Sequence, residues 1–386
     1  MKKDYQKLSI KVHKKTRGKL EIVSRIPINN RNDLSIAYTP GVAGPALAIA
    51  RNKKLAYDLT STKNGVAIIS DGSAVLGLGN IGPEAALPIM EGKAVLFKRF
   101  ANIDAFPIVL STQNSDEIVV AVKAIAPTFG GINLEDISAP RCFEIENRLK
   151  EELSIPVMHD DQHGTAVVVL AGLINALKVV GKKKEFVSVV INGAGAAGVA
   201  ITKLLYLYGI HNMVICDSKG IVEKKRQDLT PIKKELIKIT NKKNLSGSLT
   251  DAIKDADIFI GVSKGNLLKP SDIKTMTRKA IVFAMANPTP EIMPDKAKLG
   301  GAVVVASGRS DFPNQINNVL VFPGIFKGAI ESRTHQITDD MKIAAALALA
   351  AVVKKPTANK IIPYPFDKRV VASISNAIKK LAMKKP

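Results

Sequence analysis

The sequence predicts an α/β protein, in which a smaller α/β domain precedes a doubly wound parallel sheet. The first observation is residues 186–192 (FVSVVIN), a short valine-rich run typical of a strand buried on both faces, followed at once by a glycine-rich turn and a helical stretch. The second is length, because 386 residues with 46% apolar residues exceed what one hydrophobic core usually organises. We therefore expect two domains, the second of the Rossmann type.

The first domain is expected to span residues 1–160. Helix-like stretches at 83–90 and 115–126 alternate there with strand-like stretches at 66–70, 94–100 and 156–158. Alternation of this kind indicates an α/β unit of its own.

The second domain is expected to span residues 161–386. A long helix over 164–180 ends at Gly181, whose basic neighbours suit a helix C-terminus. After the strand at 186–192, short apolar runs that predict further strands follow at 213–216, 258–262, 280–285, 303–306 and 319–322. The division is compatible with a C-terminal segment that packs back on the first domain.

The composition argues against several classes of protein. Lys and Arg number 56 against 34 Asp and Glu, a net charge of +22, but only 12 are arginine and there is no tryptophan. Scattered lysines without stacking aromatics favour a solvated surface, or a field that attracts small anions, over a nucleic-acid site. The longest apolar run, 343–353, is about half the roughly 20 residues that cross a bilayer. We expect neither a membrane nor a nucleic-acid partner.

The two cysteines, Cys142 and Cys216, are too few for a disulfide framework and form no Cys-x-x-Cys motif. They are expected to be small buried hydrophobic residues in a reducing compartment. The chain is therefore expected to be cytoplasmic.

The glycine-rich turn has the spacing of a dinucleotide-binding fingerprint, with Gly193, Ala194, Gly195, Ala196, Ala197 and Gly198 in sequence. The first glycine permits a tight turn, the second lets the backbone approach a pyrophosphate, and the third lets helix and strand pack closely. Asp217 ends the next predicted strand, where a carboxylate binds an adenosine ribose and repels a 2′-phosphate. NAD is thus slightly favoured, and NADP stays open because Lys219 can offset the repulsion.

Acidic residues gather twice, as Glu135-Asp136 and within residues 159–163 (HDDQH). His159 and His163 have the i, i+4 spacing of helical zinc ligands. The five residues are expected to cross a strand-to-helix turn, where the two imidazoles would diverge. Carboxylates that leave room for water and a chelating substrate suit Mg²⁺ or Mn²⁺ better. Ordinary capping and surface acids remain the alternative at this point.

Tyr38 and Lys93 occupy positions from which a side chain can face a cleft. Tyr38 begins a Tyr-Thr-Pro-Gly turn that can present a phenol rigidly. Lys93 is expected to open the strand at 94–100. By themselves, both are ordinary surface or packing residues.

Taken together, these segments resemble the malic enzymes, in their short bacterial and archaeal form, from about residue 20 to the C-terminus. Eight segments occur in that family's order: Tyr38-Thr-Pro-Gly-Val, residues 71–82 (DGSAVLGLGNIG), Glu91-Gly-Lys93, Glu135-Asp136, residues 160–165 (DDQHGT), the dinucleotide fingerprint, Ala286-Asn287-Pro-Thr, and residues 317–324 (NNVLVFPG). Chance does not assemble eight such segments.

The resemblance implies a homodimer that oxidatively decarboxylates L-malate to pyruvate and CO₂, reduces NAD or NADP, depends on Mg²⁺ or Mn²⁺, and also decarboxylates oxaloacetate. Residue by residue, it implies Lys93 as general base with Asp160 beside it, Tyr38 as general acid, Glu135, Asp136 and Asp161 as metal ligands, Asn287 at both cofactor and substrate, and Asn317 and Asn318 at the substrate.

The implied chemistry sets a condition on the lysine. Hydride leaves C2 of malate only as the hydroxyl proton leaves, and a lysine accepts that proton only when it is itself unprotonated. Burial and a nearby divalent cation both lower a lysine pKa, so Lys93 is expected to titrate below its ordinary value.

One position departs from the pattern. Longer eukaryotic members have an arginine that pairs with the substrate carboxylate where this chain has Ala74, and no arginine lies between Arg51 and Arg99. The carboxylate anchor must come from elsewhere in the cleft or from another subunit. A different two-domain dehydrogenase, acting on amino acids or methylene-tetrahydrofolate, is the alternative; it explains the fingerprint but not the carboxylates.

Overall fold

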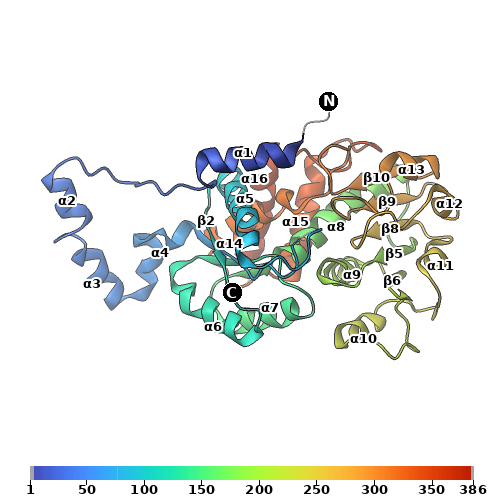
Figure 1. Ribbon diagram of the computed structural model, residues 1–386, viewed down its shortest axis with the longest axis horizontal. Helices are drawn as coiled ribbons and strands as arrows, with labels where there is room; N and C mark the ends of the chain where they lie inside the picture. The colour runs from blue at the N-terminus through green and yellow to red at the C-terminus, as the bar shows by residue number, and fades with distance from the viewer. Residues whose placement is uncertain (1–3, 76, 384–386) are drawn as a thin grey trace.

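The computed structural model describes residues 4–75 and 77–383, which form two β-sheets (Figure 1). Leu76, inside the 71–82 segment, lies outside the described residues. The predicted class is confirmed: each domain is built on a sheet of mainly parallel strands with helices on both faces.

The first sheet comprises β1 (Gly65–Ser70), β2 (Asp104–Val109), β3 (Gly131–Leu134) and β4 (Val157–His159), covered by α5 (Pro83–Ala101), α6 (Ser115–Ile125) and α7 (Arg141–Glu152), with a 3₁₀ turn η3 (Ala126–Thr128). All four strands are parallel in the order β2–β1–β3–β4. Successive strand residues face opposite sides, so Ile68 packs in the cluster that contains Phe97 of α5, and Ile69 packs against α6 and α7.

The second sheet comprises β5 (Val189–Asn192), β6 (Met213–Asp217), β7 (Gly220–Ile221), β8 (Ile258–Gly261), β9 (Ile281–Ala284) and β10 (Val304–Ser307), with helices α9 (Ala196–Tyr208), α10 (Pro231–Ile237), α11 (Leu249–Ile253), α12 (Pro270–Ile273) and α13 (Pro294–Leu299). Its order is β10–β9–β8–β5–β6–β7, parallel except for β7. Alternate residues of β5 again separate two cores: Ile191 packs in the cluster that includes α9, and Val190 packs with α11, α12 and α13.

The helix α8 (Asp160–Val180) joins the two sheets and ends at Gly181, whose φ of 70° is a left-handed cap. Among the described residues it alone is long and apolar enough to cross a membrane, but 78% of its most apolar stretch is buried in the protein. Its side chains belong to one cluster that includes strands of both sheets. α8 is therefore the central helix of a shared core.

The C-terminal segment returns to the first domain. It forms η4 (Asn318–Leu320), α14 (Phe322–Glu331), α15 (Asp339–Val352) and α16 (Arg369–Ala382). Phe322 and Phe326 pack against Phe97 of α5 in tilted and edge-on arrangements, with ring centroids 4.7 and 5.5 Å away. These aromatic contacts fasten α14 to the first domain.

Residues near the N-terminus form an arm. After α1 (Tyr5–Thr16), the chain leaves the body through α2 (Arg31–Ala37) and α3 (Ala43–Arg51), and returns through η1 (Lys53–Leu55), α4 (Ala56–Leu59) and η2 (Ser61–Asn64) (Figure 1, left). Neither α2 nor α3 has a buried residue. Within the described chain, the hydrogen bonds found for residues 27–51 all stay inside residues 27–52.

Two predictions about individual elements are wrong. Residues 94–100 belong to α5, so Lys93 lies inside a helix; the buried Ala86, Met90, Ala94 and Phe97 recur at the three- and four-residue spacing of one helix face. Residues 319–322 form η4 and the start of α14, where Pro323 suits a first helical turn.

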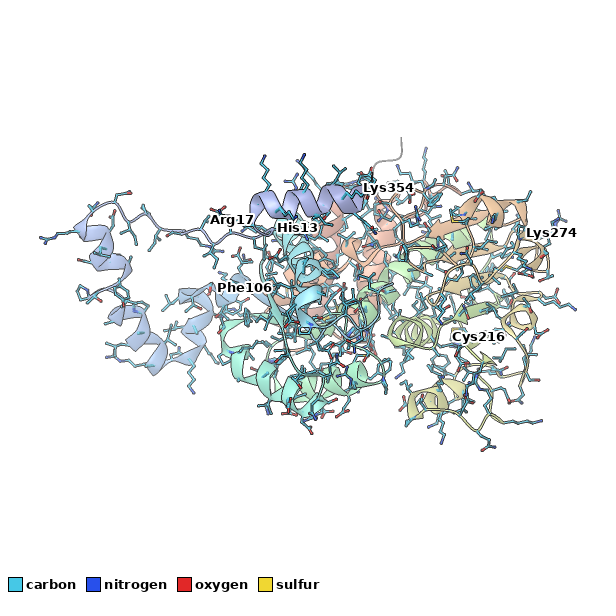
Figure 2. All side chains as sticks on the ribbon, in the orientation of Figure 1. His13, Arg17, Phe106, Cys216, Lys274 and Lys354 are labelled. Carbon is cyan, nitrogen blue, oxygen red and sulfur yellow. The ribbon has the colours of Figure 1, made fainter. Side chains whose placement is uncertain are left out.

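The strands β2 and β3 were not anticipated from the sequence. Pro107 inside β2 masks the strand pattern, and it is tolerated because β2 is an edge strand. Both cysteines are free and buried, as expected, and Figure 2 shows Cys216 in the second sheet.

Candidate active site

The ends of β3 and β4 bring the predicted carboxylates to one place. The two strands are neighbours, with Leu134 opposite His159. Because parallel strands end at the same edge of a sheet, Glu135 and Asp136 after β3 lie beside Asp160 and Asp161 after β4.

Lys93 reaches this edge from the buried face of α5. Its Nζ is 2.7 Å from Glu135 Oε1 and 2.5 Å from Asp160 Oδ2, and the side chain is only 8% exposed. The ring of Phe322 lies under the ammonium, with 4.1 Å between Nζ and the ring centroid. Residues from three separate parts of the chain, Glu135, Asp160 and Phe322, therefore surround Lys93.

The protein's own residues keep Lys93 protonated. Burial lowers its pKa, but the carboxylates of Asp160, Glu135 and Asp161 outweigh burial, and the pKa lies above its ordinary value. Burial thus acts in the expected direction, but without a cation the carboxylates decide the net pKa of Lys93. Burial would dominate only if a cation neutralised those carboxylates.

The carboxylates carry more negative charge than Lys93 balances. Burial raises the pKa of Asp160 to about 7 and that of Asp161 to about 6, although Lys93 lowers both. Burial also raises the pKa of Glu135. Asp160 Oδ1 is buried without a hydrogen-bond partner. Buried carboxylate oxygens in excess of the available cations are the donors that Mg²⁺ and Mn²⁺ prefer, so these residues fit such an ion by their chemistry.

The backbone at Asp136 departs from a strand. Its φ of 54° interrupts the alternation that would otherwise direct Glu135 and Asp136 to opposite faces. The N–H of Asp136 donates to Asp161 Oδ2 at 2.8 Å, which ties the ends of the two strands together. No three acidic, histidine or cysteine side chains of the described residues form a ready-made metal cage. The assignment of Glu135, Asp136 and Asp161 as ligands stays a prediction.

The zinc alternative finds no support in the part of the chain that the structure describes. His159 ends β4, and its two ring nitrogens are buried without a hydrogen-bond partner, with Nδ1 3.9 Å from Asp161 Oδ2. His163 lies in the first turn of α8 with Nε2 at 2.9 Å from Glu146 Oε2. His163 is thus committed to a carboxylate on another helix.

Asn318 and Asn317 lie at the start of η4. A Cβ on Gly164 would be 1.8 Å from Asp160 Oδ1 and 3.3 Å from Asn318 Cβ. Only glycine at this position of α8 leaves room for the side chain of Asp160 and for Asn318. Asn318 therefore lies beside Asp160. The side chain of Asn317 accepts from Val319 N at 2.9 Å and caps η4.

Asn287 follows β9 and meets the first domain. A Cβ on Gly77 would lie 2.7 Å from the backbone oxygen of Asn287, so the 71–82 segment touches this loop directly. Asn287 and Asn318 both lie where the two domains meet.

The fingerprint lines a cavity of about 840 Å³ at the carboxyl ends of the second sheet. A Cβ on Gly198 would be 1.6 Å from Gly193 O, so glycine is needed for α9 to start this close to β5. No described atom lies within 4 Å of a Cβ on Gly195, which leaves open space beside that backbone. α9 begins without a side-chain cap, so its N–H groups are available to an anion. The cavity fits a dinucleotide.

Asp217, at the rim of this cavity, is not a free carboxylate. Oδ1 accepts from Lys219 N at 2.9 Å and Arg226 Nη1 at 2.8 Å, and Oδ2 accepts from Arg226 Nη2 at 2.8 Å and Lys233 Nζ at 2.6 Å. These four contacts use the full accepting capacity of a carboxylate. Burial raises the pKa of Asp217, but Arg226 and Lys233 outweigh it and bring the pKa to about 2. A preference for NAD does not follow from its charge alone.

Tyr38 does not reach Lys93 within one chain. It caps the C-terminus of α2 on the arm and is 67% exposed, whereas Lys93 is buried in the body (Figure 1). A Cβ on Gly41 would be 2.5 Å from Ser35 O, so glycine lets the Tyr-Thr-Pro-Gly turn fold tightly against α2. The turn therefore belongs to the arm, whereas the carboxylates belong to the body.

Comparison with known proteins decides the family. Residues 17–150 match the malic enzyme N-terminal domain, and residues 162–384 match the malic enzyme NAD binding domain. The chain belongs to the malic enzyme family. It is therefore related to oxidoreductases that use NAD or NADP.

The similarity to malic enzymes extends over nearly the whole chain. The bifunctional malic/malolactic enzyme of Bacillus subtilis (strain 168) is 55% identical over 97% of this chain and 92% of that protein. The NAD-dependent malic enzyme of Geobacillus stearothermophilus is 57% identical over 94% of this chain and 76% of that protein. The crystal structure of malic enzyme from Pyrococcus horikoshii Ot3 is 48% identical, with a TM-score of 0.94, over 99% of this chain and 91% of that one.

Two residues of the site escaped the sequence analysis. The first is Arg141 at the start of α7, whose Nη2 lies 3.0 Å from both Asp71 Oδ2 and Ser73 Oγ. It thus binds two residues of the segment that contains Ala74, the position where the sequence analysis found no arginine. No local motif marks Arg141, because these two partners lie some seventy residues earlier in the chain.

The second missed residue is Glu146 of α7, which is 2% exposed. It lies on the helix face that buries Cys142, Ile145 and Leu149. An acid on an apolar helix face, four residues before Lys150, is a signal that could have singled it out.

Proposed function

We propose that this chain oxidises L-malate to pyruvate and CO₂ while reducing NAD or NADP, with Mg²⁺ or Mn²⁺ as metal, and that it decarboxylates oxaloacetate. The observation that carries the proposal is the position of Lys93 between Glu135 and Asp160, at the edge of the first sheet, with the domain-spanning Asn318 segment beside it.

Each residue has a distinct task in this reaction. Lys93 Nζ accepts the hydroxyl proton as hydride leaves C2 of malate for the cofactor, and Asp160, 2.5 Å away, orients the amine. When bound by Glu135, Asp136 and Asp161, the metal ion supplies the positive charge that withdraws electrons from the substrate oxygens. After CO₂ departs, the enol of pyruvate needs a proton at C3, which the Tyr38 hydroxyl donates. Asn287, Asn317 and Asn318 orient the substrate at the domain junction, with Asn287 also at the nicotinamide.

The working unit is a homodimer in which the arm of one chain completes the site of the other. The arm exposes Ile28, Leu34, Ile36, Tyr38, Val42 and Leu47, a set of apolar side chains that a monomer would leave in water. The body holds a lysine site without a tyrosine, and the arm holds a tyrosine without a site. A second copy satisfies both deficiencies, and C2 dimers exchange equivalent patches in this way.

The two domains divide near residue 160, where the first sheet ends and α8 begins. The C-terminal segment follows the second domain in the sequence, but it packs on the first domain through Phe322 and Phe326. A cytoplasmic location agrees with two free, buried cysteines.

A mixed dimer tests the division of the site. One chain carries Lys93→Ala with one affinity tag, the other carries Tyr38→Phe with a second tag, and the mixed dimer is isolated through both tags. Each homodimer should be nearly inactive. The mixed dimer retains one site with both groups intact, so it should show roughly half of the wild-type malate oxidation.

A mixed dimer as inactive as its parents would contradict the exchange of tyrosines between chains. Wild-type protein assayed with L-malate and either cofactor tests the reaction itself. Metal-independent turnover of an amino acid or a tetrahydrofolate in place of malate would overturn the proposed function.

A further inference from the structure

A buried carboxylate on α7, that of Glu146, is bound to the turn that carries Asp160 and Asp161. Glu146 Oε1 accepts from the backbone N–H of His159 at 3.0 Å. Glu146 Oε2 accepts from Gln162 Nε2 at 3.3 Å and from His163 Nε2 at 2.9 Å. Because a carboxylate only accepts, His163 carries its hydrogen on Nε2. Glu146 thus contacts the residues directly before and after the two aspartates.

Glu146 is itself fixed in place. Lys150, one helical turn later, places Nζ 2.7 Å from Oε1. With His159, Gln162, His163 and Lys150 as donors, both carboxylate oxygens are fully used. Burial would raise the pKa of Glu146, but His163 and Lys150 outweigh it and hold the pKa well below its usual range. The group is therefore a charged, fully hydrogen-bonded anchor.

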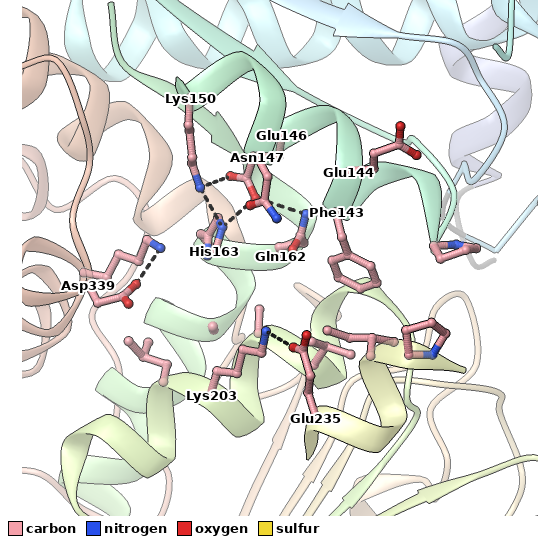
Figure 3. Close-up of a pocket in the computed structure, with 18 of the residues that line it drawn as sticks. Phe143, Glu144, Glu146, Asn147, Lys150, Gln162, His163, Lys203, Glu235 and Asp339 are labelled. Carbon is pink, nitrogen blue, oxygen red and sulfur yellow. Dashed lines mark hydrogen bonds and ion pairs between the residues drawn. The ribbon is translucent and has the colours of Figure 1, made fainter. Parts of the chain in front are cut away.

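Packing alone does not hold this side of the turn. Gln162 and His163 border a cavity of about 610 Å³ between α7 and α9, which is also lined by Lys203, Glu235 and Lys342 (Figure 3). Fewer side chains press on a helix turn that borders a cavity, so hydrogen bonds contribute more to its position. Besides the Lys93–Asp160 ion pair, the turn is held by the hydrogen bonds that Glu146 accepts and by the bond from Asp136 N to Asp161 Oδ2.

We propose that Glu146 is a positioning residue of the reaction: it sets the β4–α8 turn so that Asp160 meets Lys93 and Asp161 meets the metal. This inference rests on the proposed function. Glu146 contacts neither Lys93 nor the four carboxylates of the site in the described structure, and it acts through the backbone and side chains of residues 159–163.

The substitution Glu146→Gln isolates this role, because it keeps the shape of the side chain. The amide oxygen of the new glutamine can still accept from His159 N. Its amide nitrogen replaces the carboxylate oxygen that accepts from Gln162 and His163, and a nitrogen donor cannot accept from them. The Mn²⁺ dissociation constant, measured by electron paramagnetic resonance of free Mn²⁺, should rise about 10- to 100-fold, as for other residues that orient metal ligands. The kcat/KM for malate should fall by a similar factor.

Glu144→Gln is the matched control, since Glu144 is on the same helix but 56% exposed and paired with Arg148. It should leave both quantities unchanged. A Glu146→Gln protein that melts at a lower temperature, yet binds Mn²⁺ and turns over malate like wild type at 25 °C, would overturn the proposal and leave Glu146 a purely structural residue.

Glu146→Asp provides a second variant if Glu146→Gln does not fold. It keeps the charge but is one methylene shorter, so it cannot reach both His159 N and the first turn of α8, and it should also weaken Mn²⁺ binding. Wild-type affinity would contradict the proposal. Mn²⁺ affinity also separates the two hypotheses. Absence of malate turnover in wild type would overturn the proposed function, whereas the ratio of Mn²⁺ affinities would still decide the role of Glu146.

Discussion

The arm and the rest of the molecule, the body, differ in how far each encloses the catalytic side chain proposed for it. In the body, Lys93 is 8% exposed and is held by two carboxylates and an aromatic ring drawn from three parts of the chain. On the arm, Tyr38 is 67% exposed. A buried charge is tolerated only when several elements surround it with compensating groups, which the body alone provides. A neutral phenol needs no such enclosure and can be delivered by a neighbouring chain.

The largest effect is expected from the body's carboxylates. Chelation of divalent metal should abolish malate oxidation, because the excess negative charge around Lys93 is then uncompensated and the lysine stays protonated. Either Mn²⁺ or Mg²⁺ should restore the activity, since every proposed ligand is a carboxylate oxygen. Steady-state assays of dialysed protein with each metal measure this. Full turnover in the chelated protein would contradict the metal site.

The next effect concerns the base itself. Lys93→Ala should lower malate oxidation by roughly 10²–10⁴-fold, and small amines should restore part of it by entering the vacated space. Lys98→Ala is the control, because Lys98 lies on the same helix but is 55% exposed and pairs with Asp104. Turnover near wild type in the Lys93→Ala protein would remove the lysine from the reaction.

A smaller effect is expected from the arm. Ile36→Asp places a charge among the exposed apolar side chains of α2, so the dimer dissociation constant should rise at least about tenfold. Activity should fall at low protein concentration and recover at high concentration, which analytical ultracentrifugation and dilution assays can follow together. Val120→Asp, at an exposed valine on α6 of the body, provides the control. Equal behaviour of both variants would argue against an arm-mediated dimer.

The smallest effect is expected at the cofactor rim. Asp217→Ser frees Arg226 and Lys233, two cations beside the cavity, so the KM for NADP should fall by about tenfold or less while the KM for NAD changes little. Asp228→Ser is a useful comparison, because Asp228 also pairs with Arg226 but does not line the cavity. An unchanged NAD-to-NADP ratio would place cofactor selectivity elsewhere.

The second sheet was the most predictable part of the fold. Its strands are short apolar runs buried on both faces, a pattern that needs no knowledge of distant residues. Residues 94–100 were wrongly predicted to be a strand, because Val95, Leu96 and Phe97 are consecutive and apolar. The helical spacing of the buried residues becomes visible only over the 19 residues of α5. The Pro107 edge strand was hidden for the opposite reason, since an edge tolerates what a central strand does not.

The site divides along the same line. That Glu135, Asp136, Asp160 and Asp161 act together was implied by the resemblance to malic enzymes. Local pattern predicted β4 but not β3, so it did not place the four carboxylates at one sheet edge. The direction of the Lys93 pKa does not follow from local pattern either, because it depends on Asp160, 67 residues away. Nor does the occupation of Asp217 by Arg226 and Lys233, which lie 9 and 16 residues later on no recognisable motif. Charge balance is set by distances between segments, and those appear only in the folded chain.

The chain crosses between the two sheets twice, outward through α8 and back through η4 into α14. A single tether would let one domain swivel in any direction, but two tethers leave rotation about the line through them as the easy motion. Asp160 at the start of α8 and Asn318 at the start of η4 lie at these tethers and beside each other. Groups on such an axis move least, so a rotation of the domains would change the spacing of Asp160 and Asn318 less than that of groups away from the axis. Rotation of this kind would let the cavity at the second sheet exchange cofactor without separating these two residues.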